Sequence, residues 1–199
     1  MVGIIDYGMG NLYSVLNAFL SLGKKARIVT KPQELKSVDY CILPGVGAFG
    51  DAMSILSKTG MSSAILKFVK TGKPFMGICL GVQLLFGTSE ESKSKKGLSL
   101  VEGDVVRFKG SVKIPHMGWN QMGIVKKSPL LKGIKDGSFV YFCHSYYVRP
   151  ENKQEVIGET NYTKMFASVI AKDNVFGIQF HPEKSQETGL KIVENFARL

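Results

Sequence analysis

A cysteine between two glycines is the position of this sequence best suited to nucleophilic chemistry. The apolar run from Phe75 to Ile78 ends at Cys79, and a predicted helix begins at once with Leu80, which leaves almost no room for a turn. Gly77 and Gly81 remove side chains that would clash where strand and helix cross, as in a G-x-S-x-G nucleophile elbow. A helix N-terminus also favours a thiolate. We therefore predict that Cys79 is a covalent nucleophile rather than a core residue.

A histidine far downstream is the strongest candidate for the base that such a nucleophile needs. An apolar segment from Val175 to Phe180 leads to His181, and Pro182 cannot continue a strand ladder. His181 and Glu183 should project from the strand end, where the carboxylate can fix the tautomer of the imidazole. The sequence therefore predicts a Cys79, His181 and Glu183 triad. His116, by contrast, is expected to be an ordinary hydrogen-bonded core or surface residue.

A glycine-rich loop could supply the backbone donors that amide hydrolysis requires. The segment from Leu43 to Asp51 follows a predicted strand and precedes a predicted helix. An oxyanion that develops during attack on an amide needs two N–H donors. One would be the N–H of Leu80, and the second the N–H of Val46 or Gly47. An ordinary tight turn explains the same glycines equally well.

The elements that must position these residues alternate between strand and helix in the first half of the chain. This alternation predicts an α/β fold with a mostly parallel central sheet flanked by helices, and with function at the C-terminal ends of the strands. From Gly97 to Lys172, shorter aromatic-rich segments with Gly and Pro turns predict added antiparallel strands. Asn11 should cap the first helix and Gly23 should end it. Predicted strands cover Val2–Asp6, Ala26–Thr30 and Tyr40–Leu43, and predicted helices cover Met61–Lys70 and Gln186–Leu199.

Length and composition favour one globular domain over residues 1–199. Of the 199 residues, 44% are hydrophobic, which is enough for a substantial core. No apolar run approaches the length of a membrane span and no signal peptide opens the sequence, so we expect a cytoplasmic protein with no membrane partner. Cys41 and Cys143 lie in apolar segments, and we expect both to be reduced core residues.

The charge balance does not by itself indicate a nucleic-acid partner. The net charge is +10, but most of the basic residues are scattered lysines. The densest group, Lys93-Ser94-Lys95-Lys96, lacks interleaved aromatic residues, and no nucleic-acid-binding motif is present. We read this group as a solvated loop and expect no nucleic acid.

Cofactor and metal patterns are also missing from the sequence. The stretch from Asp6 to Gly10 could begin a dinucleotide-binding loop, but Tyr13 occupies the place of the third glycine. No group of Cys and His has the spacing of zinc ligands. Thiolate, imidazole and oxyanion hole suffice for amide hydrolysis, so no cofactor and no metal are expected.

Taken together, P-G-V-G, G-I-C-L-G-V-Q and H-P-E resemble the motifs of class I, triad-type glutamine amidotransferases. Further strings resemble the glutaminase subunits of imidazole glycerol phosphate synthase, from histidine biosynthesis. These strings are D-Y-G-M-G-N at 6–11, P-H-M-G-W-N at 115–120 and H-P-E-K-S at 181–185. The resemblance covers essentially the whole chain, with no departure at a catalytic position.

The resemblance implies hydrolysis of glutamine through a γ-glutamyl thioester on Cys79. It also implies a heterodimer in which ammonia passes directly into a separate (β/α)8-barrel cyclase subunit of imidazole glycerol phosphate synthase. That subunit forms imidazole glycerol phosphate and the aminoimidazole carboxamide ribonucleotide. By the same resemblance, glutamine is held by Gln83, Glu91, Ser145 and Tyr146, with a backbone contact from Gly47. The face that meets the barrel would contain Asn11, Trp119, Asn120, Tyr141 and Lys184.

Two other functions fit the sequence. One is an amidotransferase subunit of a different synthase, such as those for pyridoxal phosphate, anthranilate or carbamoyl phosphate. The other is a cysteine hydrolase that transfers no ammonia, or a catalytically silent binding module on the same scaffold. Trp119 could equally be a core residue.

Overall fold

A computed structural model describes all residues from 1 to 199, and its central feature is one sheet of twelve strands. The strands are β1 (Val2–Ile5), β2 (Ala26–Val29), β3 (Tyr40–Gly45), β4 (Phe75–Cys79), β5 (Phe86–Ser89), β6 (Val101–Arg107), β7 (His116–Ile124), β8 (Ser138–His144), β9 (Tyr146–Pro150), β10 (Val156–Asn161), β11 (Met165–Lys172) and β12 (Val175–Ile178). The α-helices are α1 (Leu12–Ser21), α2 (Phe49–Lys58), α3 (Met61–Val69), α4 (Leu80–Gln83) and α5 (Gln186–Phe196). The chain also forms four 3₁₀ helices: η1 (Pro32–Ser37), η2 (Pro129–Leu131), η3 (Lys153–Glu155) and η4 (Pro182–Lys184).

The sheet divides into a parallel half and an antiparallel half, as the sequence predicted. Its main path runs β2-β1-β3-β4-β12-β11-β10-β7-β8. All neighbours from β2 to β12 are parallel, and every pair from β12 onward to β8 is antiparallel. The predicted fold class is therefore confirmed. The sequence did not predict one pairing. Strand β5 lies parallel to β6, and both lie off the main path of the sheet.

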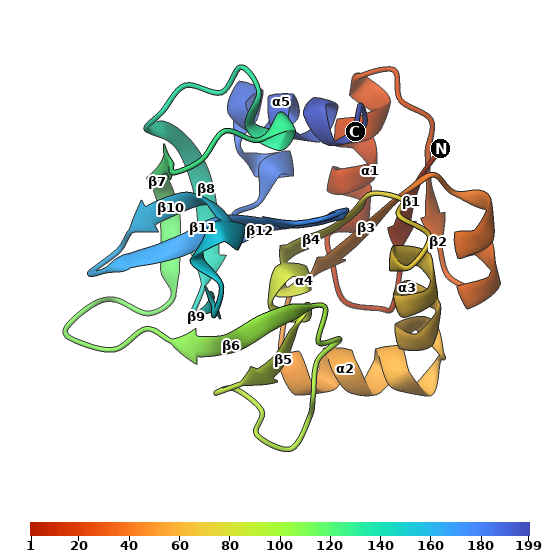
Figure 1. The fold of residues 1–199 in the computed structure, drawn as a ribbon, viewed down its shortest axis with the longest axis horizontal. Coiled ribbons are helices and arrows are strands. Elements are labelled where there is room, and N and C mark those ends of the chain that lie inside the picture. Colours follow the sequence, from red (N-terminus) through yellow and green to blue (C-terminus); the bar gives the residue numbers. More distant parts are fainter.

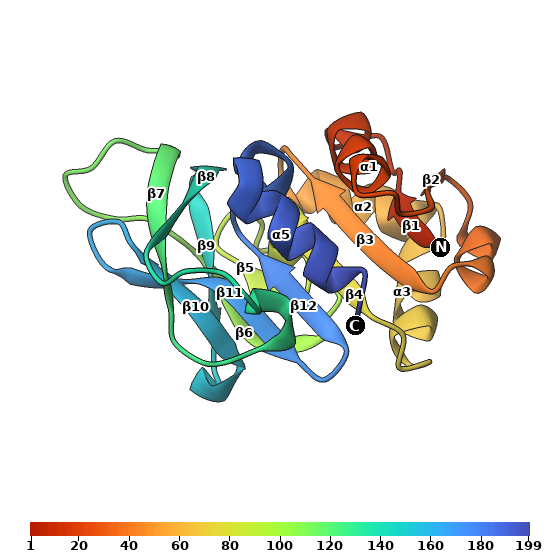
Figure 2. The same ribbon diagram turned by 90° about the horizontal axis from the view of Figure 1, so that it is seen from above.

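Helices cover both faces of the parallel half. Figures 1 and 2 show α1 and α5 on one side of these strands, with α2 and α3 on the other. The buried side chains accordingly form two cores, one including Phe19 and Phe196, and the other including Leu56 and Phe68. All five residues of β4 are buried, which is typical of a central parallel strand covered on both sides. This rigid strand carries the predicted nucleophile at its end.

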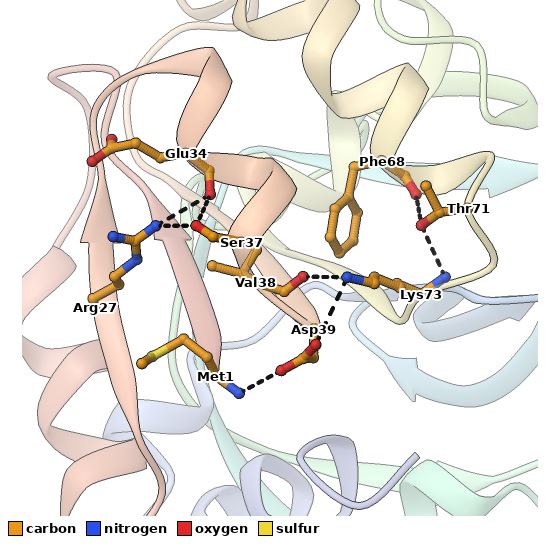
Figure 3. Close-up of polar contacts among 9 residues, drawn as sticks. All are labelled: Met1, Arg27, Glu34, Ser37, Val38, Asp39, Phe68, Thr71 and Lys73. Carbon is orange, nitrogen blue, oxygen red and sulfur yellow. Dashed lines mark hydrogen bonds and ion pairs between the residues drawn. The ribbon is translucent and has the colours of Figure 1, made fainter.

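Polar contacts fix the connection that leads into β3 (Figure 3). Arg27 in β2 donates to the Ser37 hydroxyl at 2.6 Å and to the Glu34 carbonyl at 3.2 Å, so η1 is tied to the sheet edge. On the other side, Lys73 Nζ donates to the Val38 carbonyl at 2.8 Å. These contacts link the entry of β3 to the segment before β4. The two strands whose C-terminal ends form the site are thus joined at their starts as well.

The predicted boundaries of the first helix are correct, but the predicted cap differs. Asn11 occupies the N-cap position of α1, yet its side chain makes no capping hydrogen bond. At the other end, Gly23 takes a left-handed conformation with φ of +68°, which ends the helix as expected. The Asn11 side chain is exposed and is available for other contacts.

Candidate active site

Cys79 lies at a strained turn between β4 and α4. Its φ of 56° and ψ of −111° are unusual for a residue with a side chain, and such strain is typical of functional positions. A Cβ atom on Gly81 would lie 1.8 Å from the Leu43 carbonyl oxygen, and one on Gly77 would lie 2.5 Å from the Gly81 carbonyl oxygen. Both glycines are therefore required by the close crossing of strand and helix, as the spacing predicted.

His181 and Glu183 are joined in a buried pair beside Cys79. The Nδ1 atom of His181 lies 2.8 Å from Oε1 of Glu183, and their side chains are only 6% and 2% exposed. Burial alone would lower the pKa of His181, but hydrogen bonding to Cys79 and Glu183, together with the charges of both, raises it to about 10. The ring is therefore held as an imidazolium next to the sulfur. This is the charge state that stabilises a thiolate.

A cleft of about 330 Å³ opens over the cysteine and gathers most of the predicted site residues. Its lining residues are Val46, Gly47, Cys79, Leu80, Gln83, Glu91, Pro115, Cys143, His144, Ser145, Tyr146, His181 and Lys184. Every predicted oxyanion-hole and substrate-binding residue is among them. Glu183 is not, because it lies behind the His181 ring. The cleft is thus built from segments that are far apart in the sequence.

The glycine-rich loop borders the cleft next to Cys79, the predicted nucleophile. In the parallel register of β3 and β4, Gly45 is the partner of Cys79, so the two residues that follow Gly45 lie beside the elbow. Val46 is 45% exposed, and Gly47 has a φ of +98°, which favours glycine. The loop therefore has the position, and the conformational freedom at Gly47, that a second oxyanion donor requires.

Two polar side chains of the cleft are held in defined orientations. Glu91 Oε2 accepts a hydrogen bond of 2.7 Å from the N–H of Phe49, at the start of α2. Gln83 Nε2 donates to the Tyr146 carbonyl at 3.0 Å and to Gln179 Oε1 at 3.3 Å. A carboxylate and an amide carbonyl in one cleft can accept from an ammonium group or from an amide NH₂.

One cysteine lies elsewhere than predicted, and two neighbours of the site were not predicted at all. Cys41 is fully buried in the core, but Cys143 is only half-buried and lines the cleft. The carbonyl oxygen of Cys143 lies 3.8 Å from the Cys79 sulfur. Gln179, which holds Gln83, was not predicted. Nor was Tyr7, whose buried hydroxyl has no hydrogen-bond partner and whose pKa is raised by burial and by the charge of Cys79.

Three of the residues predicted to meet a partner form one cluster that reaches the cleft through Lys184, which is one of its lining residues. The rings of Trp119 and Tyr141 meet edge to face at 6.0 Å, and Lys184 Nζ lies 5.7 Å from the centre of the Tyr141 ring. Trp119 is 47% exposed, so it is not a core residue. Asn120, in contrast, points to the opposite face of β7, where its amide donates to Asn161.

Neither a metal site nor a membrane span is found among the 199 residues. No group of three or more His, Cys, Asp and Glu side chains is arranged to hold a metal ion. The helices are also too short or too polar to cross a bilayer.

The strained elbow at Cys79, the buried His181–Glu183 pair and the mixed sheet form the scaffold of this candidate site, and sequence comparison identifies its family. The family described as glutamine amidotransferase class-I matches residues 3–199, so the chain belongs to this family. It is 52% identical over 199 residues to imidazole glycerol phosphate synthase subunit HisH of Caldanaerobacter subterraneus subsp. tengcongensis, covering 100% of this chain and 98% of that protein. It is 51% identical over 199 residues to subunit HisH of Methanocaldococcus jannaschii, covering both chains completely.

Solved structures with low sequence identity to this chain share its fold. The structure of PurLQS from Thermotoga maritima matches with a TM-score of 0.80 at 19% identity, covering 99% of this chain and 97% of that one. A glutamine amidotransferase from Thermotoga maritima matches with a TM-score of 0.67 at 18% identity, covering 99% of this chain and 82% of that one. At such low identity these matches establish the architecture alone.

Proposed function

We propose that this chain is the glutaminase subunit of an imidazole glycerol phosphate synthase, in which it releases ammonia from glutamine for a (β/α)8-barrel cyclase subunit. The observation that carries the proposal is the convergence of Cys79, His181 and the predicted glutamine-binding residues on one cleft. The proposal is supported by full-length identity of about half to proteins named as this subunit. A cytoplasmic location is part of the proposal and rests on the sequence.

The proposed chemistry begins with attack of the Cys79 thiolate on the γ-amide carbon of glutamine. The developing oxyanion would be stabilised by the N–H of Leu80 and a peptide N–H at Val46 or Gly47. His181, held as an imidazolium, would give its proton to the leaving nitrogen, which departs as ammonia and leaves a γ-glutamyl thioester.

The second half of the reaction restores the enzyme. The now neutral His181 would take a proton from water, and the resulting hydroxide would attack the thioester carbonyl. Collapse of this second tetrahedral intermediate releases the thiolate and the γ-carboxylic acid of glutamate, which loses its proton to solvent, while the proton taken from water stays on the imidazole. Glu183 would orient the ring and stabilise its positive form through the 2.8 Å contact at Nδ1. The sum is glutamine plus water giving glutamate plus ammonia.

The ammonia would leave towards a partner that covers the mouth of the cleft. Trp119 and Tyr141 form an aromatic pair that continues from Lys184 at the edge of the cleft, and Trp and Tyr are enriched in interface hot spots. Exposed Asn11, at the N-cap of α1, would extend this face, because the preceding residue Gly10 lies against Pro44 near the end of β3, just before the oxyanion loop. Partner contacts on that side would therefore reach the oxyanion loop directly.

The decisive experiment compares glutamine hydrolysis in three states. These are the isolated chain, the chain with saturating barrel subunit, and the complex with the nucleotide ligand of the barrel. We expect weak hydrolysis alone and a rise at each addition, because the peptide between Gly45 and Gly47 can turn its N–H away until the loop is fixed. Equal rates in all three states would contradict loop gating. Absence of any turnover in the complex would contradict the proposed function and favour a silent binding module.

A further inference from the structure

A continuous run of hydrogen bonds connects β7 with the glutamine-binding side of the cleft. Asn120 Nδ2 lies 3.2 Å from His116 Nε2, and His116 Nδ1 lies 3.0 Å from His144 Nε2. His144 Nδ1 then lies 2.7 Å from the carbonyl oxygen of Tyr146. The same carbonyl accepts the bond from Gln83 Nε2. Four side chains and one carbonyl thus form a single connected series.

The direction of every bond in this series follows from its two ends. A carbonyl oxygen can only accept, so His144 must carry its proton on Nδ1, and its Nε2 must accept. His116 must therefore donate from Nδ1 and accept at Nε2. Asn120 must then donate from Nδ2 to Nε2 of His116, and its other two contacts independently identify Nδ2 as the amide nitrogen. Its Nδ2 also donates to the Asn161 carbonyl at 2.9 Å, and its Oδ1 accepts from the N–H of Gln121 at 2.8 Å.

Packing keeps both imidazoles in place and neutral. His116 and His144 are only 3% and 5% exposed. The His116 ring is stacked between Phe142, at 4.7 Å, and Tyr162, at 4.0 Å. Burial lowers the pKa of His116 to about 4 and that of His144 to about 3. A neutral imidazole has one donor nitrogen and one acceptor nitrogen. Each histidine can therefore donate from Nδ1 to one neighbour and accept at Nε2 from the other.

The Tyr146 carbonyl, at the cleft end of the series, accepts from the Gln83 amide and so fixes its orientation. Both N–H bonds of its Nε2 are used, one by the Tyr146 carbonyl and one by Gln179 Oε1. An amide with its nitrogen anchored in this way presents its Oε1 to the cleft. An oxygen in that place accepts from an NH₂ or ammonium group of a ligand and repels a carboxylate.

We propose that Asn120, His116 and His144 are positioning residues that fix the Tyr146 carbonyl and thereby the Gln83 amide, so that they set the affinity for glutamine. The inference rests on the proposed function, since it assigns the ligand of the same cleft. It also gives β7 a direct connection to that ligand. Trp119, the residue before Asn120, has its side chain on the opposite face of β7, which is the face proposed to meet the partner.

The first test measures the tautomers of the two histidines in the unmodified chain. ¹⁵N NMR of the imidazole nitrogens at neutral pH should show protonated Nδ1 and unprotonated Nε2 for both His116 and His144. Free histidine in water favours the opposite tautomer, so this result would be specific to the series. A protonated Nε2 on either residue would break the direction of the bonds and overturn the proposal, whatever the activity of the protein.

The second test uses substitutions at the last histidine, assayed in the complex with the barrel subunit. His144→Phe keeps a ring but removes the bond to Tyr146, and should raise KM for glutamine about tenfold with kcat changed less than about threefold. His144→Asn places an amide nitrogen where Nδ1 was, and should recover most of the affinity. Tyr162→Phe, in the same aromatic cluster but outside the series, should leave KM unchanged.

The outcomes separate the two proposals. A folded His144→Phe variant with wild-type KM would overturn the positioning role while leaving the glutaminase function intact. An inactive wild-type complex would overturn the proposed function instead. Should His144→Phe fail to fold, the comparison of His144→Asn with wild type decides, because a large rise in its KM would also contradict the proposal.

Discussion

The imidazole of His181 lies between the Cys79 sulfur and the Glu183 carboxylate, with 2.8 Å separating its Nδ1 from Glu183 Oε1. This arrangement raises the pKa of His181 to about 10, above its ordinary value near 6.5. In Cys79→Ser and in Glu183→Gln, one stabilising neighbour is lost, so the pKa should fall by more than one unit. The measurement is an NMR titration of the His181 ring. An unchanged midpoint in both variants would show that neither neighbour holds the proton.

The raised pKa of His181 should also make the stability of the fold depend on pH. A folded-state pKa above the unfolded value means that the folded chain binds the His181 proton more tightly. This contribution is complete below pH 6.5 and is lost as the pH rises towards 10. The alkaline loss of stability should therefore be smaller in Cys79→Ser than in the wild type, as measured by urea unfolding at pH 7 and pH 9.5.

Covalent labelling should distinguish the three cysteines. A glutamine-like diazo-ketone should modify Cys79 alone, because only this thiol lies at the elbow beside an imidazolium. Cys41 is fully buried, and burial raises its pKa, so it should not react. Cys143 provides the stricter control, since it lines the same cleft. Mass spectrometry of the digested protein reads the result, and modification of Cys143 with Cys79 intact would contradict the assignment.

The two buried histidines should impose an acid limit on stability. Their pKa values of about 4 and about 3 lie below the unfolded value, so the unfolded chain binds more protons between pH 6.5 and pH 4. Stability should therefore decline as the pH falls through this window. The C2–H resonances of His116 and His144 should not titrate between pH 5.5 and 8. A midpoint near 6.5 for either residue would show that its ring is not held neutral.

Gly81, the elbow glycine in α4, should tolerate no side chain. A Cβ on Gly81 would overlap the Leu43 carbonyl, so Gly81→Ala should destabilise the fold by more than about 3 kcal/mol or prevent folding. Gly123→Ala in β7 is the matched control, because the nearest atom to its Cβ is 3.6 Å away. That variant should stay within about 1 kcal/mol of wild type in urea unfolding. Equal stability of the two variants would mean that the crossing at Gly81 can relax.

The exposed aromatic cluster should dominate association with the barrel subunit. Trp119→Ala should weaken binding at least about tenfold, since large aromatic side chains at an interface centre are frequent hot spots. Val125→Ala changes another exposed apolar residue just beyond β7 and serves as the control. Titration calorimetry with the barrel subunit measures both. Similar affinities for the two variants would place the interface elsewhere.

Much of the parallel half could be predicted because its signals are local. The glycines on both sides of Cys79 and the two-residue separation of His181 and Glu183 can each be seen within a single short segment of sequence. That these segments meet in one cleft follows from the parallel pairing of β4 with β12. The extension of the structure as one domain over residues 1–199 stays a prediction.

The antiparallel half was harder to predict because its decisive relations depend on register. His116 and His144 are separated by 28 residues and meet only because they are paired in the register of β7 and β8. The prediction that Cys143 is a core residue was wrong because β8 carries apolar side chains on both of its faces. Phe139 and Tyr141 share its outward face, so hydrophobicity alone could not reveal which residues are buried. The parallel pairing of β5 with β6 likewise had no local signal.

The two faces of the β7–β8 hairpin give this scaffold a way to change partners during evolution. Trp119 and Tyr141 are paired on the outer face, while His116 and His144 are paired on the inner one. Substitution of outer residues such as Trp119 can therefore adapt the surface to a different synthase without altering the inner series, which we propose supports glutamine binding. An insertion or deletion of one residue in either strand would exchange the faces and damage both at once. New specificities should thus arise here by substitution, with the length of the hairpin strands preserved.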